Sequence, residues 1–268
     1  MLKRLFAKRP LPSLPPAYRV YAIGDIHGRL DLFEDLLTLI AADNAARGAV
    51  HVDLVLLGDL IDRGPASAGV VRRAMQKPSW AAQLVALMGN HEEAMVEAFD
   101  GNLEMARIWL RVGGLEALQS WGVDVSRFEN VSVDEAMTMA RKAVPPDERA
   151  WMARMRTFYA VGNYYFVHAG VRPGVPLPKQ HSKDAFWIRE EFLGSRTHHG
   201  AMIVHGHSIS KDVEMFDNRI GIDTGAYATG RLTALCLEGT ERWLLQTKPK
   251  ADGFNARSQT RLTATDPI

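Results

Sequence analysis

Residues 52–64 read VDLVLLGDLIDRG, a nearly all-apolar run that ends at Gly58-Asp59 and continues to Asp62-Arg63-Gly64. A short apolar run bounded by turn residues is typical of a buried strand. The two carboxylates and the arginine therefore follow directly where a strand of the core ends. This placement predicts a polar turn at the edge of a sheet, and the rest of the chain repeats it.

Two further segments have the same order of an apolar run and a glycine-rich polar turn. Tyr18–Ile23 precedes Gly24-Asp25-Ile26-His27-Gly28, and Leu84–Met88 precedes Gly89-Asn90-His91-Glu92. Helical patterns lie between them, at Asp31–Ala46 and Ser67–Lys77. This rhythm predicts an α/β fold with parallel strands and helices packed outside. Ligands of such sheets collect beyond the carboxyl ends of the strands, where all three turns lie.

The remainder of the chain predicts one domain over residues 18–247 with a helical insertion at about 100–158. The insertion includes helical patterns at Leu103–Trp121 and Asp147–Thr157, and a capping-box start at Ser132. Strand patterns return at Tyr164–Val167 and continue to Gln246, the last of them antiparallel. Residues 1–17 predict a disordered basic and proline-rich leader, and residues 248–268 predict a disordered polar tail.

Composition narrows the class of protein. The chain has 268 residues, a formal net charge of +1 and one cysteine, Cys236. No global field therefore draws it to nucleic acid or anionic membrane, and no internal disulfide is available. The first residues lack the apolar stretch of a signal peptide, and no segment has the roughly 20 apolar residues of a membrane span. We expect a cytoplasmic protein without nucleic-acid partners or stable membrane insertion.

The first two turns supply metal ligands. Asp25 and His27 are two residues apart as the chain leaves a strand, so their side chains point the same way and can reach one cation. Asp59 holds the equivalent position after its own strand and is placed to bridge two ions. Asp62 is better placed to orient a histidine, and Arg63 offers a planar fork that matches phosphate oxygens.

Later residues complete the set. The adjacent residues Asn90 and His91 point apart, so Asn90 suits a metal while His91 remains free as a general acid held by Asp62. His168 follows an apolar strand, and His207 lies past another strand end, between Gly206 and Ser208. We prefer His207 to His205 as a direct ligand. These residues suffice for two metal ions that share one carboxylate, an arrangement that activates water for attack on phosphorus.

The order and content of these motifs resemble the phosphoprotein phosphatase family of calcineurin-like metallophosphoesterases, in particular its small bacterial and bacteriophage members. The resemblance runs from about Tyr18 to Gln246. It implies a pair of mixed β-sheets packed together and flanked by helices. It also implies the site residues. Asp25 and His27 would hold the first metal, Asp59 would bridge, and Asn90, His168 and His207 would hold the second.

The resemblance further implies a mechanism and a cofactor. His91, paired with Asp62, would protonate the leaving group, and Arg63 and Arg189 would clamp the phosphoryl oxygens while a hydroxide bridging the ions attacks phosphorus. We expect two divalent metal ions, with manganese preferred and iron or zinc as alternatives. The resemblance points to no other cofactor.

Three functions compete. The preferred one is a phosphomonoesterase acting on phosphoserine and phosphothreonine in phosphoprotein substrates. The second is a symmetrical diadenosine-tetraphosphate hydrolase or another nucleotide or small-molecule phosphatase. In that branch the third motif resembles Gly-Asn-His-Asp followed by another histidine, whereas here Glu92-Glu93 follow His91. An aromatic shelf for adenine, with Trp109, Trp121 and Trp187 as candidates, would favour the second function. The third is an inactive phosphopeptide-binding module.

Overall fold

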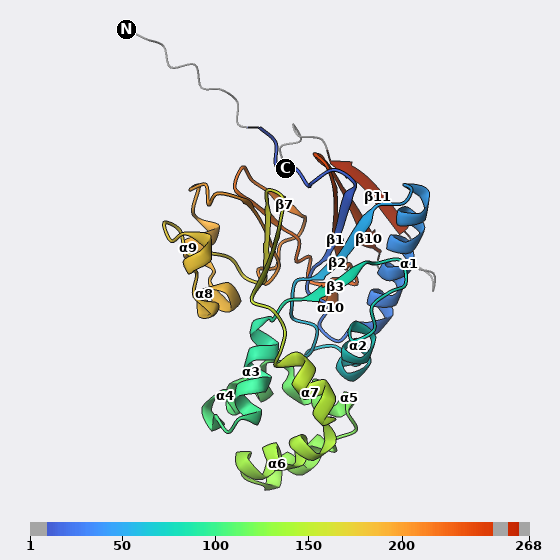
Figure 1. Ribbon diagram of the computed structural model, residues 1–268. Coiled ribbons are helices and arrows are strands. Elements are labelled where there is room, and N and C mark those ends of the chain that lie inside the picture. The colour runs from blue at the N-terminus through green and yellow to red at the C-terminus, as the bar shows by residue number, and fades with distance from the viewer. Residues whose placement is uncertain (1–9, 249–256, 263–268) are drawn as a thin grey trace.

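Two mixed β-sheets form the centre of the molecule, as the computed structural model of residues 10–248 and 257–262 shows (Figure 1). The first sheet has the order β11-β10-β9-β1-β2-β3 and the second β4-β5-β6-β8-β7. The first contains β1 (Tyr18–Ile23), β2 (His51–Leu56), β3 (Gln83–Ala86), β9 (Thr233–Glu238), β10 (Glu241–Thr247) and β11 (Arg257–Leu262). The second contains β4 (Phe158–Val161), β5 (Tyr164–Val167), β6 (Met202–His205), β7 (Glu214–Met215) and β8 (Arg219–Gly221). This architecture confirms the predicted fold class.

Parallel pairing brings the polar turns to one edge. Strand β1 pairs in parallel with β2, and β2 with β3, so the three strands end together. In the second sheet, β5, β6 and β8 are also parallel neighbours. The antiparallel hairpin of β9 and β10 matches the prediction for the end of the domain. Because the carboxyl ends of parallel strands meet at one edge, residues far apart in sequence converge there.

The core has three layers. Between the two sheets lie apolar side chains such as Val20, Val55, Phe166 and Leu235. The outer face of the first sheet packs against helices α1 (Leu30–Ala46) and α2 (Ser67–Ala74). The outer face of the second sheet packs against α8 (Ser182–Trp187) and α9 (Glu190–Leu193), which lie on the opposite side of the molecule (Figure 1). Two sheets buried on both faces give a rigid base for the turns at their edge.

A helical segment extends from one end of the sandwich (Figure 1). It begins with α3 (Asn90–Phe99) and continues through α4 (Leu103–Trp109), a π-helical turn (Leu110–Gly114), α5 (Leu115–Ser120), a 3-10 turn (Val125–Asn130), α6 (Val133–Ala143) and α7 (Pro146–Met152). Ser132 caps α6 and forms the predicted capping box with Glu135. The helix expected over residues 147–157 ends earlier, because the main chain of Arg156 bonds to Ala86 and Met88 and extends the sheet edge beside β3.

The two ends of the chain differ in part from the prediction of disorder. Residues 1–9 of the leader lie outside the described residues, but Leu14 is buried and its N–H donates to the carbonyl of Gly239. In the tail, Arg257–Leu262 forms β11 and pairs with β10. An added edge strand is held by main-chain hydrogen bonds, so its side chains need not carry an apolar pattern that sequence analysis can find.

Among the described residues, no helix is both long and apolar enough to cross a membrane.

Candidate metal centre

Strained main-chain turns mark the edge where the strands end. Six non-glycine residues have positive φ among the described residues, and five of them belong to the predicted polar turns. These five are His27 (φ 43°), Asp59 (49°), Asp62 (74°), Arg63 (65°) and His207 (63°). Such conformations cost roughly 1–3 kcal/mol each and persist where the surrounding structure enforces them. Their concentration here indicates a functional site.

Glu92 enforces part of that strain. Its buried carboxylate accepts hydrogen bonds from the main-chain N–H groups of Asp59 (2.9 Å), Leu60 (2.7 Å) and Gly89 (2.9 Å). It thereby ties the turn after β2 to the turn after β3. Burial, with a smaller contribution from Asp59, raises the pKa of Glu92 to about 7. From the sequence, Glu92 had only the ordinary preference of an acidic residue for a helix start.

Asp59 lies at the centre of two groups of potential ligands. One group is His27, Asp59 and His91, the other Asp59, His168 and His207, and all of these residues are buried. The two carboxylate oxygens face different groups: Oδ2 is 3.5 Å from His27 Nε2, and Oδ1 is 3.4 Å from His168 Nε2. One carboxylate placed between two sets of imidazoles is compatible with a bridging ligand, the role that the sequence analysis predicts for Asp59.

Main-chain carbonyls fix the imidazole tautomers. His27 Nδ1–H donates to the carbonyl of Ile61 (2.8 Å), and His168 Nδ1–H donates to that of Leu57 (2.9 Å). Because a carbonyl oxygen only accepts, the Nε2 lone pairs must face the cluster around Asp59. This arrangement is typical of metal-ligating histidines.

The second group also contains Asn90. Its Oδ1 is 3.1 Å from His168 Nε2, and that nitrogen is 3.2 Å from His207 Nδ1. His207 Nε2 is buried without a hydrogen-bond partner among the described residues. Asn90 Oδ1, His168 Nε2 and His207 Nδ1 therefore lie close together with few protons between them. Such a set of nitrogen and oxygen donors suits first-row divalent ions.

Electrostatics favour a cation at this edge. Burial lowers the pKa of His27 to about 3, and burial followed by the charge of His168 lowers that of His207 to about 2. Burial alone would raise the pKa of Asp59, but the surrounding imidazoles outweigh it and keep the pKa well below its usual range. His27 and His207 are therefore neutral and Asp59 is ionised at neutral pH, which is the ligand state that metal binding requires.

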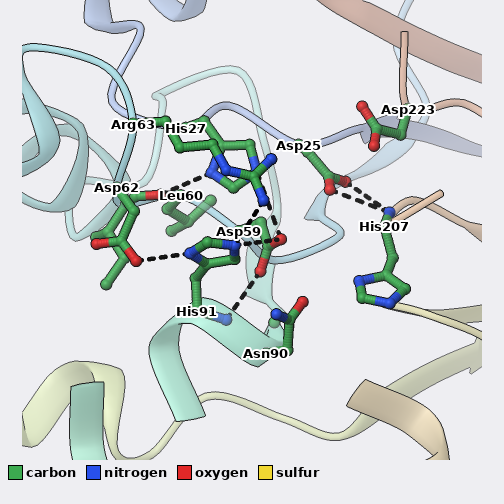
Figure 2. A network of polar contacts seen from close by, with 12 residues as sticks. Asp25, His27, Asp59, Leu60, Asp62, Arg63, Asn90, His91, His207 and Asp223 are labelled. Carbon is green, nitrogen blue, oxygen red and sulfur yellow. Dashed lines mark hydrogen bonds and ion pairs between the residues drawn. The ribbon is translucent and has the colours of Figure 1, made fainter. Parts of the chain in front are cut away.

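Asp25 lies beside both groups, and a second carboxylate lies near it (Figure 2). Asp25 accepts hydrogen bonds from the main-chain N–H of His207, at 3.1 and 3.0 Å. Burial, then the charges of Asp223 and Asp59, raise its pKa. Sequence analysis missed Asp223, which is buried and whose pKa burial raises to about 6. The signal was available, because Asp223-Thr224-Gly225 follows β8 as Asp25 and Asp59 follow their strands.

His91 and Asp62 form a close pair next to Asp59 (Figure 2). His91 Nδ1 is 2.6 Å from Asp62 Oδ2, and Trp109 Nε1–H donates to both oxygens of Asp62. Burial would lower the pKa of His91, but Asp59 and Asp62 raise it above its ordinary value. His91 can therefore take up a proton, and the nitrogen open to it is Nε2, which accepts a hydrogen bond from Arg63 at 3.1 Å while the imidazole is neutral.

The two predicted arginines have different surroundings. Arg63 donates to His27 Nε2 as well as to His91, and its guanidinium lies 4.9 Å from the ring centre of Tyr227 on α10 (Ala226–Thr229). Arg189 is exposed between α8 and α9, and its charge contributes to lowering the pKa of His168 and His207. Arg63 therefore lies against the cluster, and the charge of Arg189 acts on His168 and His207.

The structure also shows where His205 and the three candidate tryptophans lie. His205 is buried away from the ligand groups, with Nδ1 against the carbonyl of Gly206 and Nε2 near Arg219. Trp109 and Trp121 are 0% and 8% exposed, so neither offers a free ring face for adenine. Trp187 is half-buried and lines a cavity of about 400 Å³ that Arg189 also lines.

Comparisons with known proteins identify a family that matches this chain. The model of the calcineurin-like phosphoesterase family matches residues 18–231. Serine/threonine-protein phosphatase 2 of Escherichia coli (strain K12) is 27% identical over 224 residues, covering 80% of this chain and 90% of that protein. The symmetrical bis(5'-nucleosyl)-tetraphosphatase of Nitrosospira multiformis is 25% identical over 288 residues, covering 87% and 97%.

A solved structure supports the fold independently. The cold-active protein-tyrosine phosphatase of a psychrophilic Shewanella species superposes with a TM-score of 0.57 at 19% identity, covering 91% of this chain and 83% of that one. At that identity the likeness shows the fold alone.

Proposed function

This chain belongs to the calcineurin-like phosphoesterase family, and we propose that within it the protein is a metal-dependent phosphomonoesterase that hydrolyses phosphoserine and phosphothreonine in proteins. The central position of Asp59 carries the proposal. Its two oxygens face two separate groups of ligands, and the His91–Asp62 pair lies directly beside it. A shared carboxylate and an adjacent proton donor are what hydrolysis of a phosphate ester requires.

The ligand assignment keeps the residues that the sequence analysis predicts. Asp25, His27 and Asp59 would hold the first ion, and Asp59, Asn90, His168 and His207 the second. The Nδ1 of His207, which lies 3.2 Å from His168 Nε2, and the inward Nε2 lone pairs of His27 and His168 fit such a role. When bound, two divalent ions, with manganese as our first choice, supply Lewis-acid stabilisation and lower the pKa of a water molecule. Iron and zinc suit the same donors.

The other predicted residues would donate a proton to the leaving oxygen and bind the charged phosphoryl oxygens. His91 would give its Nε2 proton to the leaving oxygen, while Asp62 holds the imidazole through Nδ1. Arg63 and Arg189 would bind the phosphoryl oxygens, whose charge grows in the transition state. A lone pair of His27 Nε2 serves one partner at a time, so a ligated His27 would release Arg63 for this task.

Three observations support a protein substrate. The third motif continues with Glu92-Glu93, and Glu92 is used inside the structure to hold the turns together. Trp109 and Trp121 are buried and offer no shelf for a base. The serine/threonine phosphatase of Escherichia coli is among the similar proteins.

One observation favours nucleotides as a second candidate. Trp187 lines the cavity of about 400 Å³ together with Lys183 and Arg189, so an aromatic ring and cationic groups occur together there. A base and a polyphosphate chain would need both. The similarity to the symmetrical tetraphosphatase of Nitrosospira multiformis supports this alternative equally.

The two candidates are separated by the rates at which the protein hydrolyses their substrates, followed as inorganic phosphate released from phosphopeptides and as ADP formed from diadenosine tetraphosphate. Metal-stripped protein reloaded with manganese is offered phosphoserine and phosphothreonine peptides and, separately, diadenosine tetraphosphate. We expect kcat/KM to be at least about tenfold higher on the peptides, the ratio that corresponds to 1.4 kcal/mol of transition-state preference. The reverse ranking would establish the nucleotide hydrolase. Binding of phosphopeptide without phosphate release would instead establish the binding module.

A further inference from the structure

Trp109 joins the helical segment to the proposed proton donor. It is the last residue of α4 and is fully buried, with its ring edge-on to Phe99 at 5.8 Å. Its indole N–H donates to Asp62 Oδ1 at 3.1 Å and to Oδ2 at 2.9 Å. The sequence explains the burial of a tryptophan on a helix by core packing alone. It does not explain why the N–H points at the carboxylate that holds His91.

The π-helical turn that follows Trp109 packs against the Asp62-Arg63 turn through Gly113. The carbonyl of Gly113 accepts a hydrogen bond from the N–H of Arg63 at 3.3 Å. Gly113 has φ 129°, and a Cβ there would lie 2.6 Å from Arg63 N and 2.9 Å from Asp62 Cβ. A side chain at this position would therefore push the π-helical turn away from the Asp62-Arg63 turn. Beyond α3, the helical segment thus contacts this turn through the indole of Trp109 and through Gly113.

The geometry around Asp62 shows what the indole adds. Oδ2 receives Nδ1–H of His91 at 2.6 Å, and the main-chain N–H of Asp62 donates to Ser67 Oγ at 2.9 Å. The latter contact fixes the main chain and leaves the carboxylate plane free to rotate. A donor that spans both oxygens defines that plane, and so the direction in which Oδ2 meets His91. Terminal torsions of aspartate are otherwise broad.

We propose that Trp109 is a positioning residue for general-acid catalysis, acting through Asp62 to hold His91 in the orientation that protonates the leaving oxygen. The inference rests on the proposed function of the same site. It gives the helical segment a part in the reaction, because the segment supplies the donor that fixes the dyad. It also predicts a dependence on the leaving group. A phosphoserine alkoxide needs the proton, whereas p-nitrophenolate leaves without much help.

The test compares two tryptophans of the same helical segment. Trp109→Phe removes the N–H and keeps an aromatic ring. Trp121→Phe is the matched control, since Trp121 Nε1–H also donates to a buried carboxylate, Glu148 Oε2 at 2.6 Å, but one outside the proposed site. Replacing Trp109 by 3-benzothienylalanine, in which sulfur stands for the N–H, keeps the full ring shape if the phenylalanine variant fails to fold.

Activity is measured on a phosphoserine peptide and on p-nitrophenyl phosphate. General acid–base catalysis contributes about 10²–10⁴-fold, and a misdirected acid should forfeit part of it. We expect either Trp109 variant to lower kcat on the peptide about tenfold or more with KM unchanged, and on p-nitrophenyl phosphate less than about threefold. Trp121→Phe should retain both activities. An equal loss on the two substrates, or no loss, would overturn the proposal.

A double-mutant cycle adds a second criterion. In a His91→Ala background, Trp109→Phe should lower peptide hydrolysis no further, because the group that it positions is absent. A purely structural role would reduce activity in both backgrounds, and such an additive loss would overturn the proposal.

A measurement without turnover keeps the inference separate from the proposed function. The proton between His91 and Asp62 should give a downfield N–H resonance, assigned by its absence in His91→Asn. We expect this resonance to shift or broaden in either Trp109 variant and to remain in Trp121→Phe. An unchanged resonance in a folded Trp109 variant contradicts the positioning role, even if the wild-type protein releases no phosphate and the proposed function fails.

Discussion

Strand β2 carries a buried aspartate cluster at each end, and the two clusters are built differently. Near its start, Asp53 accepts hydrogen bonds from Tyr18, from Tyr159 Oη at 2.5 Å and from His51 Nε2 at 2.9 Å. Past its end, Asp59 faces the Nε2 lone pairs of His27 and His168. Asp53 lies in a regular strand, whereas Asp59 lies in a turn with φ 49°.

Burial alone does not distinguish a carboxylate that stabilises the fold from one that binds a ligand. Both carboxylates are almost inaccessible, with 0% and 2% exposure. Asp53 is surrounded by groups that bring protons, so its hydrogen bonding is satisfied by the protein itself. Asp59 is surrounded largely by groups that bring lone pairs, so a cation completes its environment. We interpret the first cluster as stabilising the fold and the second as a metal site, and most of the following predictions separate the two.

The largest effect is expected from the carboxylate that we propose as the bridge. Asp59→Asn should abolish binding of both ions and lower kcat/KM by roughly 10⁴-fold or more, because the whole metal contribution is lost. Asp53→Asn, the matched change on the same strand, should retain metal and activity. Metal content by elemental analysis and phosphate release check both. Full metal occupancy in Asp59→Asn would remove the bridging role.

The next largest effect is expected from His91, the histidine beside Asp59, in comparison with His51, the histidine beside Asp53. His91→Ala and His91→Asn should retain metal and lower kcat by about 10²–10⁴-fold, the usual contribution of a general acid. His51→Asn, which removes the histidine beside Asp53, should leave kcat unchanged. Steady-state kinetics on a phosphopeptide provide the measurement. Wild-type turnover in His91→Ala would show that the proton comes from another group.

A smaller effect is expected from the proposed phosphate clamp. Hydrogen bonds to charged groups contribute about 1.5–3 kcal/mol, so Arg63→Ala or Arg189→Ala should weaken phosphate binding or kcat/KM about 10- to 100-fold. Arg172→Ala is the control, because Arg172 is paired with Asp184 and Glu191. Inhibition by inorganic phosphate and substrate kinetics measure the effect. Unchanged values for both clamp variants would show that the arginines have been misassigned.

For the free energy of unfolding, we expect the larger effect at Asp53 and the smaller one at Asp59, the reverse of the order expected for activity. Asp53→Ala leaves the hydroxyls of Tyr18 and Tyr159 without their acceptor, and should lower the free energy of unfolding by about 1–3 kcal/mol. Asp59→Asn in metal-free protein should change it by less than about 1 kcal/mol, because Asn tolerates the left-handed conformation and removes a buried charge. Urea unfolding of metal-free proteins compares them. A larger loss in Asp59→Asn would contradict the distinction.

The smallest effect concerns pH at the Asp53 end. Burial, with the hydrogen bond to Asp53, raises the pKa of Tyr159 above its usual range. The folded state therefore favours the neutral phenol, and its contribution is complete below the unfolded pKa of about 10 and declines as pH rises further. Tyr159→Phe should reduce the fall of unfolding free energy between about pH 9 and 11. An identical slope in both proteins would contradict this assignment.

Much of the fold followed from local patterns in the sequence. Strand β1 and strand β5 occupy the residues that their apolar runs predicted, and the turns after the strands converge because parallel strands end together. The sequence analysis named most of the polar residues that follow a strand directly, because that signal is local, but it did not name Asp223. Strand β11 was missed because main-chain pairing leaves no side-chain pattern.

The missed parts of the site depend on contacts between distant segments. Glu92 acts on main-chain amides at Asp59 and Leu60, and nothing in its own neighbourhood distinguishes it from a helix-start residue. Trp109 packs in the core, as a tryptophan in a helical pattern usually does, but the direction of its N–H depends on the placement of α4 against Asp62. Asp223 repeats the local signal of Asp25 and was available from the sequence.

The central claim is that Asp59 organises a dinuclear centre that hydrolyses phosphate esters. The most direct test titrates metal-stripped protein with manganese and follows phosphate release from a phosphothreonine peptide against the metal added per chain. The account predicts negligible release without metal and a maximum reached only at about two equivalents, as two ligand groups sharing one carboxylate require. Full activity without metal, or none at any loading with manganese, iron or zinc, would contradict it.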